Sequence, residues 1–414
     1  MSPTVDCGER GVRDVVIAGA GPAGVAVAVA LAERIGAQRI LCLDKARFPR
    51  DKPCGGGLTG HAQAALARLG LEVRVPRVPC GWGRLAYRGR ARDVVLGRPV
   101  DVVRRCEFDA DLVAQARARG IEILTGEGLA SFEVDARGDG GAGLVRIATT
   151  TGRRLTARVL VGADGAGSRV RRALIADARP PLRLFQAEVP MPPALGGLVD
   201  GRMVYDFSLM ACGLRGYLWL FPAPGGRLNV GAMHSATTTQ KLSGAAIEAL
   251  LRQGLAAYGV DLPDGARGWP AWRHQAGGRV AAPHLVCVGD AAGIDALTGE
   301  GIAVGLEHGP IAAQAIARAL ETSDFRFARY GAAIDRAVVG RELTLDGRLA
   351  RMLYAPRAGK LWLSLILFDR RVQQLYAARV SGSEVLADRK RALLGALLRH
   401  AVTAPVRLLR MQTA

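Results

Sequence analysis

The chain has 414 residues, half of them hydrophobic, which is enough for one or two packed cores. Its formal net charge is +19, and the stretch from Arg326 to Ala414 holds 17 basic against 6 acidic side chains. Such a field attracts acidic partners, so an anionic membrane surface or an acidic carrier protein is a candidate partner of this region. No nucleic acid is expected, because no recognised binding motif accompanies the charge.

Seven cysteines occur without a C-x-x-C pair or a spacing that suggests a disulfide framework, which indicates a reduced compartment. The polar start shows no sign of a signal peptide. The six histidines have no metal-ligand spacing, so no metal is expected. We therefore expect a cytoplasmic protein. Its basic C-terminal region is expected either to associate peripherally with a membrane or an acidic carrier protein, or to form a solvated helical cap.

A strand–turn–helix–strand pattern opens the chain. Residues 14–18 predict a short buried strand, which leads into the segment 19–24 with the pattern G-x-G-x-x-G. An alanine- and valine-rich helix follows to about Ile35, and a second apolar strand at 39–43 ends at Asp44. This order of elements, with the acid 20 residues after the last glycine, is typical of a Rossmann-type dinucleotide site.

Each residue type in this motif has a physical role. Gly19 permits the tight turn, Gly21 lets a pyrophosphate approach the backbone, and Gly24 lets the helix pack close to the sheet. The helix N-terminus offers free N–H groups to the phosphates, and Asp44 accepts hydrogen bonds from a ribose hydroxyl. Two further contacts of the cofactor are expected at Ala23 and Lys45.

A first likeness to a known family lies at the segment from Arg105 to Asp109. With Leu112 it resembles the R-x-x-F/L-D-x-x-L pattern of the FAD-dependent aromatic hydroxylase superfamily. The resemblance implies that Arg105 reaches the ribose and phosphate region of FAD. Leu129 is expected in the same cofactor site.

The segment 162–172 contains Gly-Ala-Asp164-Gly165 after a predicted strand, and it resembles the D-G motif of the same superfamily. That motif supports the flavin region. A third segment, Gly289-Asp-Ala-Ala-Gly293 followed by 298–302, resembles the second FAD motif, whose aspartate binds the ribityl chain and whose backbone faces the flavin. The cofactor contacts that these two motifs imply are Asp164, Gly289, Asp290, Gly299, Gly301 and Ile302.

Two segments narrow the family. Lys52-Pro-Cys54-Gly-Gly-Gly57 closely resembles the K-P-C-G-G-G segment of the geranylgeranyl reductase family, in which the cysteine lies near the flavin. The successive glycines suit close approach to a planar ring. The resemblance implies that Cys54 and Gly55 contact the cofactor, while Gly56 borders the substrate cavity.

The second such segment is Tyr217-Leu-Trp219-Leu-Phe221-Pro222, in which the aromatic residues share one face of a predicted strand. It resembles the Y-x-W-x-F-P motif of the geranylgeranyl reductases, which lines the substrate cavity. The flavin-dependent halogenases have a related W-x-W-x-I-P segment, but tyrosine and phenylalanine occupy the outer places here.

The predicted fold is α/β: a Rossmann-type FAD-binding domain with an inserted antiparallel-sheet substrate domain and a C-terminal helical region. The expected ranges are 1–180 and 276–325 for the FAD-binding domain, 181–275 for the substrate domain, and 326–414 for the basic helical region.

The resemblance implies an FAD-dependent reductase that reduces C=C bonds of a hydrophobic, isoprenoid-like or carrier-borne substrate. Cys54, Tyr217 and Trp219 are the candidate catalytic residues, and NAD(P)H or another reductant is the expected electron donor. The alternative is a monooxygenase (hydroxylase or epoxidase) or halogenase acting on an aromatic or alkene secondary metabolite. A flavoprotein without catalysis is disfavoured.

Overall fold

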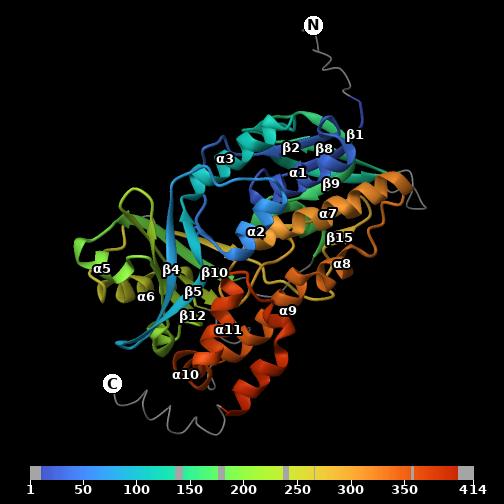
Figure 1. Cartoon of the computed structure of the whole chain (residues 1–414). Helices are drawn as coiled ribbons and strands as arrows, with labels where there is room; N and C mark the ends of the chain where they lie inside the picture. The colour runs from blue at the N-terminus through green and yellow to red at the C-terminus, as the bar shows by residue number, and fades with distance from the viewer. Residues whose placement is uncertain are drawn as a thin grey trace.

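The computed structural model describes residues 11–135, 143–175, 182–235, 242–264, 266–355 and 359–399. Within these residues the strands form two eight-stranded sheets, which lie at opposite ends of the molecule (Figure 1). The first sheet has the order β15-β16-β9-β1-β2-β6, with the β7–β8 hairpin joined to β9. Its strands are β1 (Arg13–Ala18), β2 (Ile40–Asp44), β6 (Glu122–Thr125), β7 (Leu129–Asp135), β8 (Leu144–Thr149), β9 (Arg154–Gly162), β15 (Ala281–Ala282) and β16 (Leu285–Cys287).

The centre of this sheet is parallel, because β16, β9, β1, β2 and β6 all run in one direction. Parallel strands are covered on both faces and therefore consist of continuous apolar runs. Residues 15–18, 40–43 and 159–161 are such runs, and all of them are buried. The carboxyl ends of β1, β2, β9 and β16 consequently lie along one edge, where a ligand of an α/β sheet binds.

Helices α1 (Pro22–Ile35) and α7 (Ile302–Thr322) pack directly on each other beside the sheet (Figure 1). Glycines make this close approach feasible. A Cβ on Gly309 would lie 2.6 Å from the Cβ of Ala26, and one on Gly305 would lie 3.0 Å from the Cβ of Ala23. The contact brings the N-termini of both helices to the same region of the molecule. Other helices and short helical turns of the two sheet regions are α2 (Gly60–Arg68), α3 (Arg105–Ala118), α4 (Arg169–Leu174), α5 (Gly196–Val199) and α6 (Gly244–Ala256).

The second sheet has the order β14-β10-β13-β12-β11-β4-β5-β3 and is antiparallel except for the β11–β4 pair. Strands β3–β5 lie within the range expected for the first part of the FAD-binding domain, but their hydrogen bonds join the second sheet. The domain boundaries themselves remain a prediction. The strands are β3 (Gly57–Leu58), β4 (Arg77–Tyr87), β5 (Arg90–Val103), β10 (Leu182–Pro190), β11 (Arg202–Asp206), β12 (Gly216–Ala223), β13 (Arg227–Ser235) and β14 (Arg267–Ala271).

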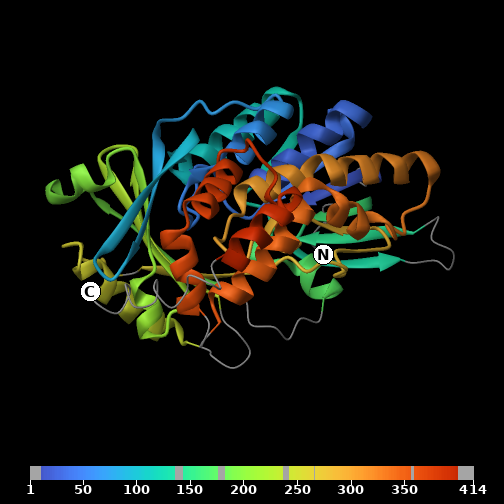
Figure 2. The same ribbon diagram turned by 60° about the horizontal axis from the view of Figure 1, so that its bottom comes forward.

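The C-terminal region is helical in its described part. Figures 1 and 2 show these helices against the second sheet, and α11 contacts both β5 and α2. Residues 390–399 form a last helical segment, while residues 400–414 of the predicted helical region lie outside the described residues. Among the described helices none is long and apolar enough to cross a membrane. The C-terminal helices are α8 (Tyr330–Arg336), α9 (Val338–Leu353), α10 (Gly359–Phe368) and α11 (Arg370–Val380).

Candidate functional site

A cavity of about 700 Å³ is lined by residues of both sheets and of α11. It brings together segments that are far apart in the chain, including all three motifs of the cofactor site and the aromatic strand β12. The predicted site residues that line it are Gly19, Gly21, Ala23, Asp44, Lys45, Cys54, Gly55, Gly56, Arg105, Leu129, Asp164, Tyr217, Trp219, Phe221, Gly289, Asp290, Gly299, Gly301 and Ile302.

Two predicted residues are not among those that line the cavity. Gly24 lies in the first turn of α1, where a Cβ would meet the carbonyl oxygen of Gly19 at 1.9 Å, so its role is close packing. Pro222 is buried in β12 next to Phe221. Successive side chains of a strand point to opposite faces, so Pro222 cannot share the cavity face with its aromatic neighbours.

The turn after β1 is shaped for backbone contact with a ligand. Gly19 has φ +107°, and a Cβ there would lie 2.2 Å from the carbonyl oxygen of Ala163. Helix α1 begins after Gly21 with Pro22 and has no side-chain cap. The free N–H groups of its first turn therefore remain available, as a bound pyrophosphate requires.

Asp44, at the end of β2, holds this turn in place while it faces the cavity. One carboxylate oxygen accepts a hydrogen bond from the backbone N–H of Ala20 and the other from that of Ala46, both at 2.9 Å. Arg50 lies nearby, with its Nε 3.9 Å from Asp44 Oδ2 and its Nη2 3.1 Å from Asp109 Oδ2. Arg50 was not predicted as a site residue, because it lies in an irregular loop without a motif of its own.

Arg105 is buried, and its guanidinium forms a bidentate pair with Asp109 at 2.7 and 2.8 Å. Burial lowers its pKa, but the Asp109 carboxylate raises it, and the net direction is upward. The arginine is therefore a fixed positive charge at the cavity wall, which suits a phosphate or ribose group.

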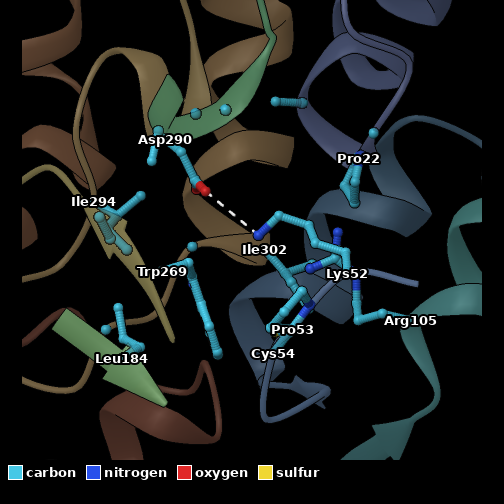
Figure 3. Close-up of a pocket in the computed structure, with 18 of the residues that line it drawn as sticks. Pro22, Lys52, Pro53, Cys54, Arg105, Leu184, Trp269, Asp290, Ile294 and Ile302 are labelled. Atoms are coloured by element: carbon cyan, nitrogen blue, oxygen red, sulfur yellow. Dashed lines mark ion pairs between the residues drawn. The ribbon is translucent and has the colours of Figure 1, made fainter. Parts of the chain in front are cut away.

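Figure 3 shows Lys52 extending across the cavity towards Asp290, with Nζ 3.5 Å from Oδ2. The loop that carries Asp290 is oriented by His308, whose Nδ1 accepts a hydrogen bond from the Gly289 N–H at 3.1 Å. Burial lowers the pKa of His308 to about 3, so the ring is neutral and Nδ1 can accept. His308 was not predicted as a site residue, since it acts through the backbone from inside α7.

The second helix that points at the cavity is α7. It begins after Gly301 without a side-chain cap, and Gly299 in the preceding loop has φ +76°. Its first N–H groups and positive dipole end therefore face the cavity beside Asp290. Two uncapped helix N-termini, an acid at the end of β2 and a glycine-rich loop around one cavity fit an FAD molecule in both its pyrophosphate and flavin parts.

Aromatic side chains form the opposite wall. Tyr217, Trp219 and Phe221 follow one another on the cavity face of β12, with ring centroids 6.2 Å apart for each neighbouring pair. Asn229 joins this wall to the loop of Cys54, because it accepts from Trp219 Nε1 at 2.8 Å and donates to the Cys54 carbonyl at 2.7 Å. A single amide thus sets the distance between the two predicted family motifs.

Gly55 and Tyr217 show how closely these parts fit. A Cβ on Gly55 would lie 3.0 Å from the ring of Phe221, so a larger residue would displace the loop or the ring. The Tyr217 hydroxyl donates to the carbonyl oxygen of Thr298 at 2.5 Å, and burial raises its pKa well above the usual value. Tyr217 therefore stays protonated, and its proton is engaged with a backbone acceptor.

The remaining wall comes from residues that were not predicted from the sequence. Leu184, Met203, Tyr205, Trp269 and Ile294 lie on or near the second sheet, and their apolar character carries no signal of a site. Figure 3 shows Leu184, Trp269 and Ile294 around the same cavity as Cys54 and Asp290.

From α11, Tyr376, Arg379 and Val380 also reach this wall. Arg379 is buried and pairs with two carboxylates of α9, Glu342 at 2.6 Å and Asp346. Burial raises the pKa of Asp346, while Arg379 lowers it, and the net direction is upward. The ion cluster therefore fixes α11 against the cavity.

A second cavity of about 150 Å³ adjoins the first and is lined almost wholly by aliphatic and aromatic side chains. It lies between the β4–β5 hairpin and the C-terminal helices. The residues that line both cavities are Met203, Tyr205, Tyr217, Thr298, Tyr376 and Val380. The larger cavity thus has an apolar neighbour on the other side of a wall rich in tyrosine.

Comparison with known proteins agrees with this geometry. A family model described as an FAD binding domain matches residues 13–188. A menaquinone reductase of Mycobacterium tuberculosis is 31% identical over 83% of this chain and 85% of that protein. A digeranylgeranylglycerophospholipid reductase of Methanopyrus kandleri is 29% identical over 75% of this chain and 78% of that protein.

Among solved structures, a geranylgeranyl bacteriochlorophyll reductase-like protein of Thermoplasma acidophilum has a TM-score of 0.71 and 19% identity. The match covers 97% of this chain and all of that one. The expected α/β fold and the expected class of flavoenzyme are confirmed. The chain belongs to the geranylgeranyl reductase family, within the FAD-dependent aromatic hydroxylase superfamily, and is an FAD-dependent oxidoreductase.

Proposed function

We propose that this enzyme reduces a C=C bond of an isoprenoid-like lipid, with a prenylated quinone as the first substrate to test. The observation that carries this proposal is the apolar cavity behind Tyr205 and Tyr217, which shares this wall with the large cavity and has a lining suited to a hydrocarbon chain. Two relatives are named for the reduction of substrates that bear prenyl chains, menaquinone and a digeranylgeranyl phospholipid. Reduced FAD would supply the hydride.

The residues of the chain would exclude water, orient the alkene and provide a proton. Tyr217, Trp219 and Phe221 form a buried aromatic wall that keeps the reacting bond in a dry environment. We assign the proton to Sγ of Cys54, which is half-buried and lines the cavity beside Gly55. Because the Tyr217 hydroxyl donates to a carbonyl, we assign it a positioning role.

The electron donor and the cellular setting complete the proposal. We propose that NAD(P)H or another external reductant reduces the flavin. We also propose that the enzyme acts in the cytoplasm beside a membrane, because a polyprenyl substrate partitions into lipid.

The test is an anaerobic single turnover. Enzyme with chemically reduced FAD is mixed with a short-chain menaquinone in detergent, and the product is analysed by mass spectrometry. We expect two added hydrogen atoms that remain in the product after air has returned any menaquinol to the quinone, and reoxidised flavin in equal amount. Incorporation of isotopically labelled oxygen in an aerobic reaction, without hydrogenation under anaerobic conditions, would instead identify a monooxygenase.

Two variants test the proposed proton donor. Cys54→Ala should lower the single-turnover rate about 100-fold while FAD stays bound, which is the usual size of a general-acid contribution. Cys106→Ala is the matched control, because Cys106 is also half-buried but does not line the cavity. Equal rates for the two variants would refute the role of Cys54.

A further inference from the structure

The last described helical segment, residues 390–399, has two apolar faces with different surroundings. Leu393 and Ala396 are buried and Leu397 is half-buried, so this side packs on the protein. Leu394 and Leu398 are exposed by 57% and 64% on the outer side. Two large aliphatic side chains that are this exposed and lie one helical turn apart indicate a surface that binds an apolar partner.

Basic residues surround the exposed leucines. Lys390 lies four residues before Leu394, so Lys390, Leu394 and Leu398 follow one line along the helix surface. Arg391 is exposed beside this line. A helix with leucines at the centre of a basic face is typical of segments that lie in the headgroup region of an anionic bilayer.

The inner face of the same segment closes the apolar cavity. Leu393 and Leu397 line that cavity together with Gly83 and Val94 of the β4–β5 hairpin and Trp362 of α10. The segment that carries Leu394 and Leu398 on its outer side therefore forms the cover of this cavity, at a part of the cavity whose lining residues do not border the large cavity. An entrance there would lead past the tyrosine-rich wall into the large cavity.

We propose that residues 390–399 dock on an anionic lipid bilayer and that the apolar cavity opens to the bilayer beside them. The apolar chain of the substrate then passes from the membrane between this segment and the β4–β5 hairpin without crossing water. This inference rests on the proposed function for the identity of the hydrocarbon chain that enters the cavity. Docking on the bilayer can be measured without any turnover.

A bilayer explains the surface better than an acidic carrier protein does. The acidic side chains of a carrier protein would pair with Lys390 and Arg391. They would offer no apolar partner to Leu394 and Leu398. A bilayer accepts both kinds of group at once, because lysine and arginine reach the headgroups while leucine enters the acyl boundary. The substrate's own solubility places it in the same phase.

The first experiment measures binding of the full-length holoenzyme to vesicles of phosphatidylcholine containing one-third phosphatidylglycerol. Replacing Leu394→Ser and Leu398→Ser together should weaken binding about tenfold, as expected for the loss of two partly inserted leucines. Val12→Ser is the control, because Val12 is exposed by 53% just before β1 of the first sheet and lines neither cavity, and it should bind as the wild type.

Three results would overturn the docking surface. These are unchanged binding of the double variant, equal losses in the double variant and in Val12→Ser, and equal binding to vesicles of phosphatidylcholine alone. A different result would assign the surface to an acidic protein instead: a polyglutamate peptide displaces the enzyme from the vesicles, and in its presence the wild type and the double leucine variant bind the vesicles equally. Melting temperatures confirm that each variant is folded.

The second experiment tests the entrance. Lipids with brominated acyl chains quench tryptophan fluorescence at short range, and Trp362 lines the apolar cavity. Brominated vesicles should quench the wild type, and Trp362→Phe should lose the larger part of this quenching while it binds vesicles equally well. The double leucine variant should show little quenching by vesicles but normal quenching by the same lipid in detergent. Quenching that is unaffected by Trp362→Phe would refute chain entry, whatever the outcome of the turnover assay.

Discussion

The two ends of the large cavity differ in what forms their surface. At the end that holds the three predicted cofactor motifs, called the flavin end below, loops after β1, β2 and β16 expose backbone N–H groups and glycines, such as Gly19 with its φ of +107°. At the other end, side chains from β11, β12 and α11 form the wall, and they are held by contacts such as those of Arg379. A cavity wall formed by the backbone requires particular residue types at fixed positions of the sequence. A wall formed by side chains depends on which elements pack together in the fold.

The largest effect is expected at the side-chain end. Replacing Arg379→Met removes the ion-pair partner that Glu342 and Asp346 share, and both carboxylates are buried. The free energy of unfolding should fall by roughly 3–5 kcal/mol, as for other buried pairs that lose one partner. Urea unfolding followed by circular dichroism measures the loss.

A triple variant is the control for this prediction. When Glu342→Leu and Asp346→Leu accompany Arg379→Met, no buried charge of the cluster remains, and most of the lost stability should return. If the triple variant is no more stable than Arg379→Met alone, the cluster acts through shape and not through charge.

A substitution at the flavin end should weaken FAD binding more than it lowers the free energy of unfolding. Gly19→Ala places a Cβ 2.2 Å from the carbonyl oxygen of Ala163 and requires a left-handed φ. The turn must then move, and we expect FAD to bind roughly 100-fold more weakly, which corresponds to the 1–3 kcal/mol of such strain. Equilibrium dialysis with FAD measures the change.

The variant Gly152→Ala separates the effect of the steric clash from the effect of the left-handed backbone conformation. Gly152 has φ +87° but nothing within 4 Å of an added Cβ, and it does not line the cavity. This variant should lose about 1 kcal/mol of stability for the left-handed conformation and bind FAD as the wild type. If it weakens FAD binding as much as Gly19→Ala does, a general loss of stability and not the turn explains both.

This difference also explains what could be predicted from the sequence. Gly19, Asp44 and Asp290 were predicted because a bound dinucleotide restricts both their type and their spacing. Tyr376 and Arg379 were not predicted, although they line the same cavity, because α11 reaches it only through tertiary packing on β5 and ion pairs with α9. The aromatic residues of β12 lie between these cases. Their period of two placed them on one face, and only a family resemblance connected that face with a substrate.

The buried His308 at the flavin end should make the free energy of unfolding depend on pH. Its pKa is about 3 in the folded protein, against about 6.5 for an ordinary histidine, because it is fully buried. Between these values the unfolded chain binds more protons, so stability falls as the pH drops below 6.5. This residue alone should remove about 2 kcal/mol between pH 7 and pH 5.

The variant His308→Gln should show a shallower fall in stability over the same range. Its side-chain oxygen can still accept the Gly289 N–H, while no group at this position titrates. Urea unfolding at pH 7 and at pH 5 for both proteins gives the comparison. Parallel losses in the two proteins would mean that other groups dominate the acid sensitivity.

The smallest effect is expected for Tyr217→Phe, which keeps the aromatic wall and removes one hydrogen bond. The bond to the Thr298 carbonyl is worth about 1 kcal/mol of stability, and its loss lets the loop before α7 move slightly. If Tyr217 only positions the wall, the turnover rate should fall less than tenfold and its pH profile should keep its shape.

Tyr258→Phe is the appropriate reference, since Tyr258 also loses a hydrogen bond, to Asp206 at 2.7 Å, and does not line either cavity. It should reduce stability by a similar amount without a change in the turnover rate. If Tyr217→Phe instead slows turnover by about 100-fold or more and loses one limb of the pH profile, Tyr217 is the proton donor. The chemistry would then depend on the side-chain end of the cavity, and the assignment of the proton to Cys54 would be wrong.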